Sequence, residues 1–246
     1  MVKQRTFLDV FNQAKDLAGD CVKFLLGLFI TLSWEDLRIL VVKKQELFNA
    51  LKKGVISVLA KNALEFAELR LEWQKFYSDV MGMTMDFSKL VIPPKPDGDW
   101  WLIAVAPGIT YNQIATKLGT LFRVRIYGDK LINGLKEQRK ATIDAPYAIW
   151  VRAATEADPD NANRSADDLA DTDQITLMER LLLEGVYFQR TGKHLDINKT
   201  TLCAGSRALV GSVPRVYWDS GGDELSVGWC SVDNRGVDLR SRSASC

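Results

Sequence analysis

Few residues of this sequence have the types and spacing that catalysis or metal binding requires. The chain of 246 residues contains a single histidine, His194, so any chemistry that depends on imidazole rests on that one position. Its four cysteines, Cys21, Cys203, Cys230 and Cys246, are too widely spaced for a CxxC or zinc motif and show no disulfide pattern. The sequence therefore does not favour a metalloenzyme or a triad hydrolase. We expect no catalytic residue, no metal and no cofactor.

The densest group of carboxylates lies at 156–173, where seven acidic residues accompany one arginine, Arg164. The stretch 158–163 resembles the start of a calcium loop, but it lacks the glycine at the sixth position and the distal glutamate of an EF-hand. We interpret it as a solvated acidic loop, with calcium binding as the alternative.

A smaller group of basic residues precedes the acidic segment. Its members are Arg123, Arg125, Lys130, Lys136, Arg139 and Lys140. Because the whole chain has a net charge of only +1, we interpret this group as an ordinary charged face and expect no nucleic-acid partner.

The overall composition is that of a soluble globular protein, with 47% hydrophobic and 26% charged residues. The longest strongly apolar stretch, residues 24–32, has nine residues, whereas a membrane span needs about 20. No signal peptide is evident. We expect no membrane span and, by default, a cytoplasmic location.

The N-terminal third has apolar residues at helical spacing. This pattern predicts three helices joined by short turns: one over 7–18, a second that Ser33 and Asp36 open and that continues to residue 59, and a third over 64–80. We expect a helical bundle over residues 1–90, with a homo-oligomerisation or docking module as the alternative to a self-contained core. The proline-rich segment 92–98 predicts a domain boundary.

After this boundary, strand and helix signals alternate. Strand composition predicts strands at 100–106, 122–127 and 147–153. Helices are predicted at 111–119 and 176–191, the second ending at Gly192 as C-cap. Together these elements predict an α+β domain over residues 91–246.

The last 46 residues have a different composition, with eight Ser, six Gly and no Lys, Gln or Met. Two stretches alternate in polarity around Ser220-Gly-Gly-Asp, which predicts a β-hairpin. The residues expected to face the core are Val216, Trp218, Leu225, Val227 and Trp229. The residues expected to face outward are Arg215, Tyr217, Asp219, Ser226, Gly228 and Cys230. An outward thiol at Cys230 has no packing rationale in this pattern.

Short motifs occur in a fixed order along the C-terminal part of the chain. They are Tyr147-Ala-Ile-Trp-Val-Arg152, Thr176-Leu-Met-Glu-Arg180, residues 188–196, Thr201-Leu-Cys-Ala-Gly-Ser-Arg207, Val213-Pro, Leu225-x-Val-x-Trp229 and Leu239-Arg-x-Arg242. With the motifs in this order, the segment from about residue 85 to residue 246 resembles the variable proteins of diversity-generating retroelements. The resemblance implies a C-type lectin fold related to that of formylglycine-generating enzymes. The polar end, residues 240–246, departs from the family pattern.

In that family, a reverse transcriptase rewrites template adenines, chiefly in asparagine codons, and so diversifies a C-terminal region. The resemblance implies a variable region at about 207–240. A randomised AAC or AAT codon cannot encode Lys, Gln, Glu, Met or Trp, so Trp218, Glu224 and Trp229 are expected to be fixed. The candidate variable, ligand-binding positions are Ala208, Leu209, Ser212, Arg215, Tyr217, Asp219, Gly228, Cys230, Ser231, Asp233, Asn234, Gly236 and Asp238.

The resemblance implies a binding protein whose variable surface recognises changing partners, which we expect to be proteins. The alternatives are an enzyme of the formylglycine-generating type, with Cys203 and Cys230 as thiols, and a structural or assembly protein that uses the helical bundle. We expect Cys203 to be a buried, inert thiol and His194 to complete its helix rather than act as a base. We expect Arg207, Arg240 and Arg242 to brace loops and strand ends.

Overall fold

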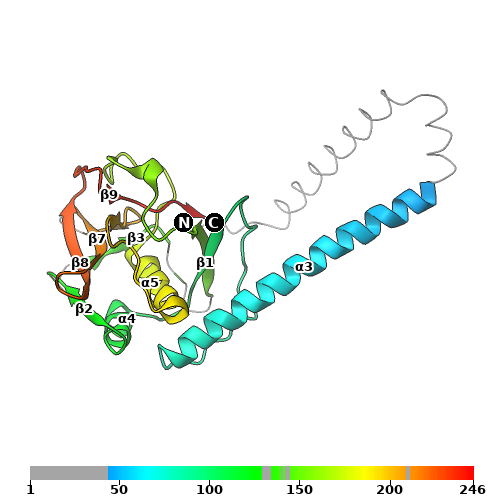
Figure 1. The fold of residues 1–246 in the computed structure, drawn as a ribbon, viewed down its shortest axis with the longest axis horizontal. Coiled ribbons are helices and arrows are strands. Elements are labelled where there is room, and N and C mark those ends of the chain that lie inside the picture. Colours follow the sequence, from blue (N-terminus) through cyan, green and yellow to red (C-terminus); the bar gives the residue numbers. More distant parts are fainter. Residues whose placement is uncertain (1–43, 129–133, 140, 142–144, 209–210) are drawn as a thin grey trace. The chain divides into compact units, whose positions relative to one another are not determined.

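The fold was obtained as a computed structural model, which describes residues 44–128, 134–139, 141, 145–208 and 211–246 (Figure 1). It is a mixed α+β structure. Its helices are α3 (Lys44–Asp79), α4 (Tyr111–Leu118) and α5 (Leu177–Thr191), with a 3₁₀ turn η2 (Pro159–Asn161). Its strands are β1 (Trp100–Val105), β2 (Arg123–Ile126), β3 (Lys136–Glu137), β4 (Tyr147–Arg152), β5 (Thr200–Leu202), β6 (Ser206–Arg207), β7 (Ser212–Asp219), β8 (Glu224–Ser231), β9 (Leu239–Arg240) and β10 (Ala244–Ser245).

Helix α3 runs without interruption from Lys44 to Asp79. The prediction of separate second and third helices, with a turn between residues 59 and 64, is therefore wrong. The stretch 60–63 contains no Gly or Pro, and its residues continue a helix readily. The predicted first helix at 7–18 and the cap at Ser33 lie outside the described residues.

The chain divides into two compact units, Met1–Glu65 and Phe66–Cys246. The boundary was predicted near residue 90, but the end of α3 belongs to the core of the second unit. Trp73 donates from Nε1 to the carbonyl of Leu102 at 3.2 Å, and Tyr77 donates from its hydroxyl to the carbonyl of Ala104 at 3.1 Å. Burial raises the pKa of Tyr77 far above its usual value. The helix and β1 are thus parts of one packed structure.

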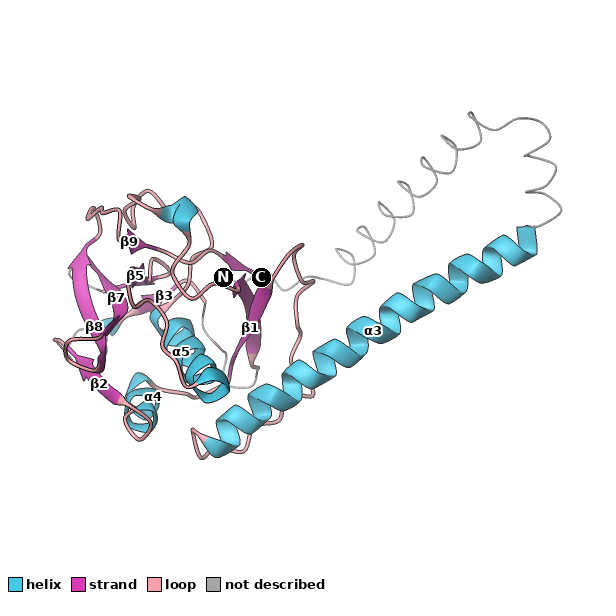
Figure 2. Ribbon diagram, in the orientation of Figure 1, coloured by secondary structure: helices cyan, strands magenta, loops and turns pink. Residues whose placement is uncertain are grey.

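Two main sheets contribute to this core (Figure 2). In the first, β4 lies between β1 and β10 and is antiparallel to both. The second has the order β2-β8-β7-β5-β9, and β3 pairs separately with β6. Helix α5 packs on both main sheets, through β1 and β7, and α4 packs on α5. The predicted strands at 100–106, 122–127 and 147–153 correspond to β1, β2 and β4.

Helix α5 confirms the helix predicted at 176–191, and its ends follow from local chemistry. Thr176 is the N-cap and forms a capping box with Glu179, while Gly192 ends the helix in the left-handed conformation at φ 66°. Near its centre, Gly185 allows a close approach, because a Cβ there would lie 2.7 Å from Leu118 Cδ2 and 2.9 Å from Phe76 Cζ. This contact holds α3, α4 and α5 together.

Candidate functional site

The hairpin β7–β8 is anchored to the core by one of its faces, as its alternation predicted. Val216, Trp218, Leu225 and Val227 are buried in the main core. The strands are antiparallel in a register that pairs Val216 with Val227. The prediction that these four residues face the core is therefore confirmed.

Trp229, which was expected to be buried with them, is only half-buried. It packs at the edge of the core, and its Nε1 donates to the carbonyl of Tyr127. This hydrogen bond connects β8 to the residue that follows β2, so Trp229 stabilises the edge of the sheet.

The opposite face of β7 presents half-exposed side chains. Arg215, Tyr217 and Asp219 alternate with the buried residues, as expected. The guanidinium of Arg215 lies 6.0 Å from the ring centroid of Tyr217. Arginine and tyrosine dominate binding hot spots because they combine large contact area with hydrogen bonding. This strand therefore has the composition of a recognition surface.

On β8 the outward positions are covered, contrary to expectation. Ser226 and Gly228 are buried, although their side of the strand faces away from the main core. They lie directly opposite Tyr217 and Arg215. A Cβ at Gly228 would lie 3.3 Å from Arg215 Nε, so the arginine side chain lies across the glycine. The large residues of β7 thus cover the small residues of β8.

Cys230 is half-buried, and its packing explains a thiol at this position, contrary to the expectation from the sequence. A second apolar cluster lies beside this end of the hairpin, and Cys230 and Val232 pack against it. Its members are Ala166, Leu169, Leu202, Ala204, Val213 and Leu239. Sequence alternation could not reveal this cluster, because it forms only when the loop around residues 166–169 folds over the sheet.

The remaining candidate positions fall into two groups. Ser231, Asp233, Asn234 and Asp238 are exposed, and Gly236 and Ser212 are half-buried. Ala208 is buried, which corrects its placement on a ligand-binding surface, and its N–H donates to the carbonyl of Ser212 at 2.9 Å. Leu209 lies outside the described residues.

Strand β2 extends the exposed face beyond the predicted variable region. It runs parallel to β8, with Arg125 next to Ser226. Glu224, almost fully buried, forms ion pairs with Arg123 at 3.0 Å and Arg125 at 3.3 Å. This pairing gives Glu224 a structural role and raises the pKa of Arg125 through the hydrogen bond and charge of Glu224.

Tyr127 follows β2 and is 47% exposed, and its ring centroid lies 5.2 Å from the guanidinium of Arg125. Arg125 was predicted to belong to an ordinary charged face, and Tyr127 to a strand at 122–127. Only the pairing of β2 with β8 brings them beside the hairpin.

The three C-terminal arginines brace the chain, as expected. Arg207 donates to the carbonyls of Ala204 and Ala166. Arg240 donates to the carbonyl of Val237 at 2.9 Å. Arg242 is fully buried and donates to Asp196 and to the carbonyl of Ala154, both at 2.7 Å.

His194 packs against aromatic rings at the end of α5. Its ring is stacked on Trp218 with an interplanar angle of 5°, and its Nδ1 lies 2.9 Å from the carboxylate of Glu184. A cavity of about 380 Å³ beside it is also lined by Phe122, Phe188 and Asp223, with no serine or cysteine among its described lining residues. The histidine thus joins the helix end to the hairpin.

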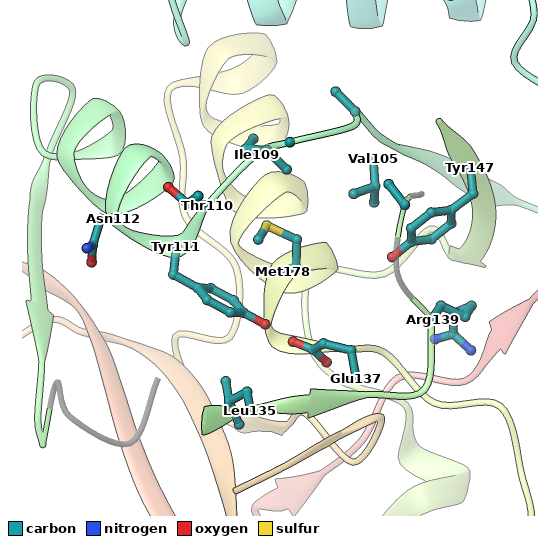
Figure 3. A pocket seen from close by; sticks show the side chains of 13 residues that line it. Val105, Ile109, Thr110, Tyr111, Asn112, Leu135, Glu137, Arg139, Tyr147 and Met178 are labelled. Carbon is teal, nitrogen blue, oxygen red and sulfur yellow. The ribbon is translucent and has the colours of Figure 1, made fainter. Parts of the chain in front are cut away.

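A larger cavity of about 500 Å³ lies beside the start of α5 (Figure 3). In Figure 3 the hydroxyl of Tyr111 points toward Glu137 across it. Arg139 is buried and pairs with Glu179 at 2.9 Å, and Tyr147 donates to the same carboxylate at 2.9 Å. Arg139 was expected on an exposed basic face. It is instead buried and pairs with Glu179 in the first turn of α5.

Two carboxylates of the acidic segment 156–173 form ion pairs with arginines outside it. Asp160 forms an ion pair with Arg152 at 2.7 Å, and Asp168 forms one with Arg235 at 2.8 Å. Across the described ranges of the chain, no group of three His, Cys, Asp or Glu side chains could hold a metal ion. In the same ranges, no helix is long and apolar enough to cross a membrane.

Thiol reactivity offers a test of this packing. Burial raises the pKa values of Cys203 and Cys230 above the usual value of 9.0, and Cys203 is fully buried. Among the cysteines that the structure describes, we expect iodoacetamide at pH 8 to modify exposed Cys246 first, Cys230 slowly and Cys203 only after unfolding, as measured by peptide mass spectrometry. Modification of Cys203 in the folded protein at the rate of Cys246 would contradict the assigned burial.

Comparisons with protein-family models, with curated proteins and with solved structures returned no match for this chain.

Proposed function

We propose that this chain is a ligand-binding protein of the kind it resembles, a variable protein of a diversity-generating retroelement. In this proposal the half-exposed face of β7, with Arg215, Tyr217 and Asp219, recognises a protein partner. The observation that carries it is the alternation along this strand, in which Val216 and Trp218 are buried while Arg215, Tyr217 and Asp219 are half-exposed. A protein whose binding residues are rewritten needs this separation.

The arrangement of the second unit supports a C-type lectin-like scaffold as part of the proposal. Strands β1 and β10, from the beginning and end of this unit, belong to one sheet through β4. These pairings join the first and last strands of the unit without involving β7 or β8. The surface can then change while the scaffold keeps its shape.

The proposal assigns no catalytic role to His194, since stacking on Trp218 and the contact with Glu184 already account for its position. An oligomer through the N-terminal helix belongs to the same proposal. Leu64 and Leu71 of α3 are exposed and lie seven residues apart, the spacing of a coiled-coil seam, which a second copy of this chain would cover.

A substitution series tests whether the proposed surface is free to vary. We expect the triple variant Arg215→Ser, Tyr217→Ser and Asp219→Ser to lose no more than about 1.5 kcal/mol of unfolding free energy, because surface substitutions cost about 0.5 kcal/mol each. The matched control is Trp218→Ala, on the same strand but facing the core, which we expect to cost about 3–5 kcal/mol. Both values come from denaturant unfolding followed by circular dichroism. A triple variant as unstable as Trp218→Ala would show that the surface is structural.

A further inference from the structure

The exposed face of the hairpin continues across β8 onto β2. The registers place Arg125, Ser226 and Tyr217 in one row across the three strands. In the next row, Tyr127 follows β2 and donates its N–H to the carbonyl of Val227, beside Gly228 and Arg215. Small residues on the central strand thus lie between an Arg–Tyr pair on each side. We call these four residues, Arg125, Tyr127, Arg215 and Tyr217, the Arg–Tyr face.

The two halves of this face have matching chemistry. Arg125 lies 5.2 Å from the ring of Tyr127, and Arg215 lies 6.0 Å from the ring of Tyr217. Strands in a sheet are about 4.8 Å apart, so the two pairs, separated by one strand, are about 10 Å apart. This distance lets one extended segment of a partner contact both pairs at once.

Hydrogen-bond donors on the face lack acceptors within the described part of the protein. Arg215 Nε and Ser226 Oγ are buried there without a hydrogen-bond partner. Arg215 is held by packing over Gly228, so its side chain can turn outward without breaking a hydrogen bond at Nε. After that movement, Arg215 Nε could donate to an acceptor from outside.

The charges on and beside the face favour an anionic acceptor. Arg123, Arg125 and Arg215 contribute three positive charges. The buried carboxylate of Glu224 pairs with the first two of them. Two further carboxylates, Asp219 and the exposed Asp223, lie at the hairpin turn, and Asp219 accepts the N–H of Gly221 at 3.0 Å. Guanidinium groups bind carboxylates through paired, charge-assisted hydrogen bonds.

We propose that the Arg–Tyr face binds an acidic segment of a partner protein, with its carboxylates at Arg125 and Arg215 and its backbone or apolar groups on the two tyrosines. This inference rests on the proposed function and extends it. Arg125 and Tyr127 lie outside the variable region at 207–240, so β2 supplies a constant half of the surface. The constant half sets the acidic class of partner, while Arg215 and Tyr217 set the choice within that class.

The test uses the full chain and a fluorescein-labelled decaglutamate peptide, with binding followed by fluorescence anisotropy at low salt. We expect Arg125→Ala, Tyr127→Ala and Arg215→Ala each to weaken binding by about fivefold or more. Arg125→Lys, which keeps a charge beside Glu224, should retain part of the affinity. The matched control, Arg164→Ala, removes a half-exposed arginine from the acidic segment and should leave the affinity for the peptide unchanged. Circular dichroism checks that each variant is folded.

Several results would overturn the inference. They are no binding of decaglutamate, equal weakening by Arg164→Ala, equally tight binding of decalysine, or tighter binding of a single-stranded DNA decamer that needs the same arginines. Any of these results would exclude an acidic partner but would not contradict the proposal that the surface of β7 is variable. The substitution series on β7 tests that surface separately, so the two failures can be told apart.

Discussion

Replacing Arg242 with methionine is expected to lower the free energy of unfolding by about 3–5 kcal/mol, the cost of breaking a buried ion pair by removing one partner. The guanidinium is fully buried and donates to the carboxylate of Asp196 at 2.7 Å, to the carbonyls of Ala154 and Thr155 at 2.7 and 3.1 Å, and to the Thr201 hydroxyl at 3.2 Å. Methionine fills much of the volume but removes all the hydrogen bonds that the guanidinium donates.

The expected loss is large because the same carboxylate serves a second arginine. Arg180 donates to Asp196 at 3.0 Å and to Glu184 at 2.8 Å. Burial alone would lower the pKa of Arg180, but the charges of these two carboxylates hold it above its usual value. Without Arg242, the buried group has one positive charge for two carboxylates. Urea unfolding measures the effect.

Arg240→Met is the matched control, two residues earlier in the chain. Arg240 makes one hydrogen bond, to the carbonyl of Val237, at the exposed surface. We expect a change of about 0.5 kcal/mol or less. Equal effects of the two substitutions would contradict the assignment of Arg242 as a buried brace between loops.

The second large effect concerns the domain boundary. A fragment that begins at Ile92, the boundary suggested by the prolines, is expected not to fold. It lacks Trp73, Phe76, Tyr77 and Phe87, all fully buried in the core. Loss of one core aromatic side chain costs about 3–5 kcal/mol, and a whole domain is stable by only about 5–15 kcal/mol. Near-ultraviolet circular dichroism and thermal unfolding distinguish the outcomes.

A fragment that begins at Phe66 is the control, because it keeps these aromatic residues and starts where the second unit begins. We expect it to unfold cooperatively with the near-ultraviolet spectrum of packed tryptophans. A cooperative transition of the Ile92 fragment at the same temperature would show that the end of α3 is dispensable to the core.

Features set by neighbouring residues could be predicted from the sequence. Gly192 ends α5 as predicted, and the helix begins at Leu177, within one residue of the predicted start. The alternation of Val216 and Trp218 with Arg215 and Tyr217 correctly divides β7 into two faces. In both cases the signal lies within a few residues, so local periodicity is sufficient.

Features set by distant contacts could not be predicted. The helical spacing of Trp73 and Tyr77 is the same whether they pack within a bundle or, as here, on β1. The sequence pattern gave no packing partner for Cys230, but in the fold Cys230 packs against the apolar cluster that contains Leu169. Arg125 joins the candidate surface only because β2 pairs in parallel with β8, about 100 residues later in the chain.

The central claim is that the exposed face of β7 is diversified while its buried face is fixed. Sequencing the DNA beside the gene tests this claim most directly. We predict a near-copy of the segment that encodes residues 207–240, next to a reverse-transcriptase gene. Its differences should fall at adenines in the codons of exposed residues such as Arg215, Tyr217 and Asp219 and spare Val216 and Trp218. The absence of such a copy, or differences spread equally over buried and exposed codons, would contradict the claim.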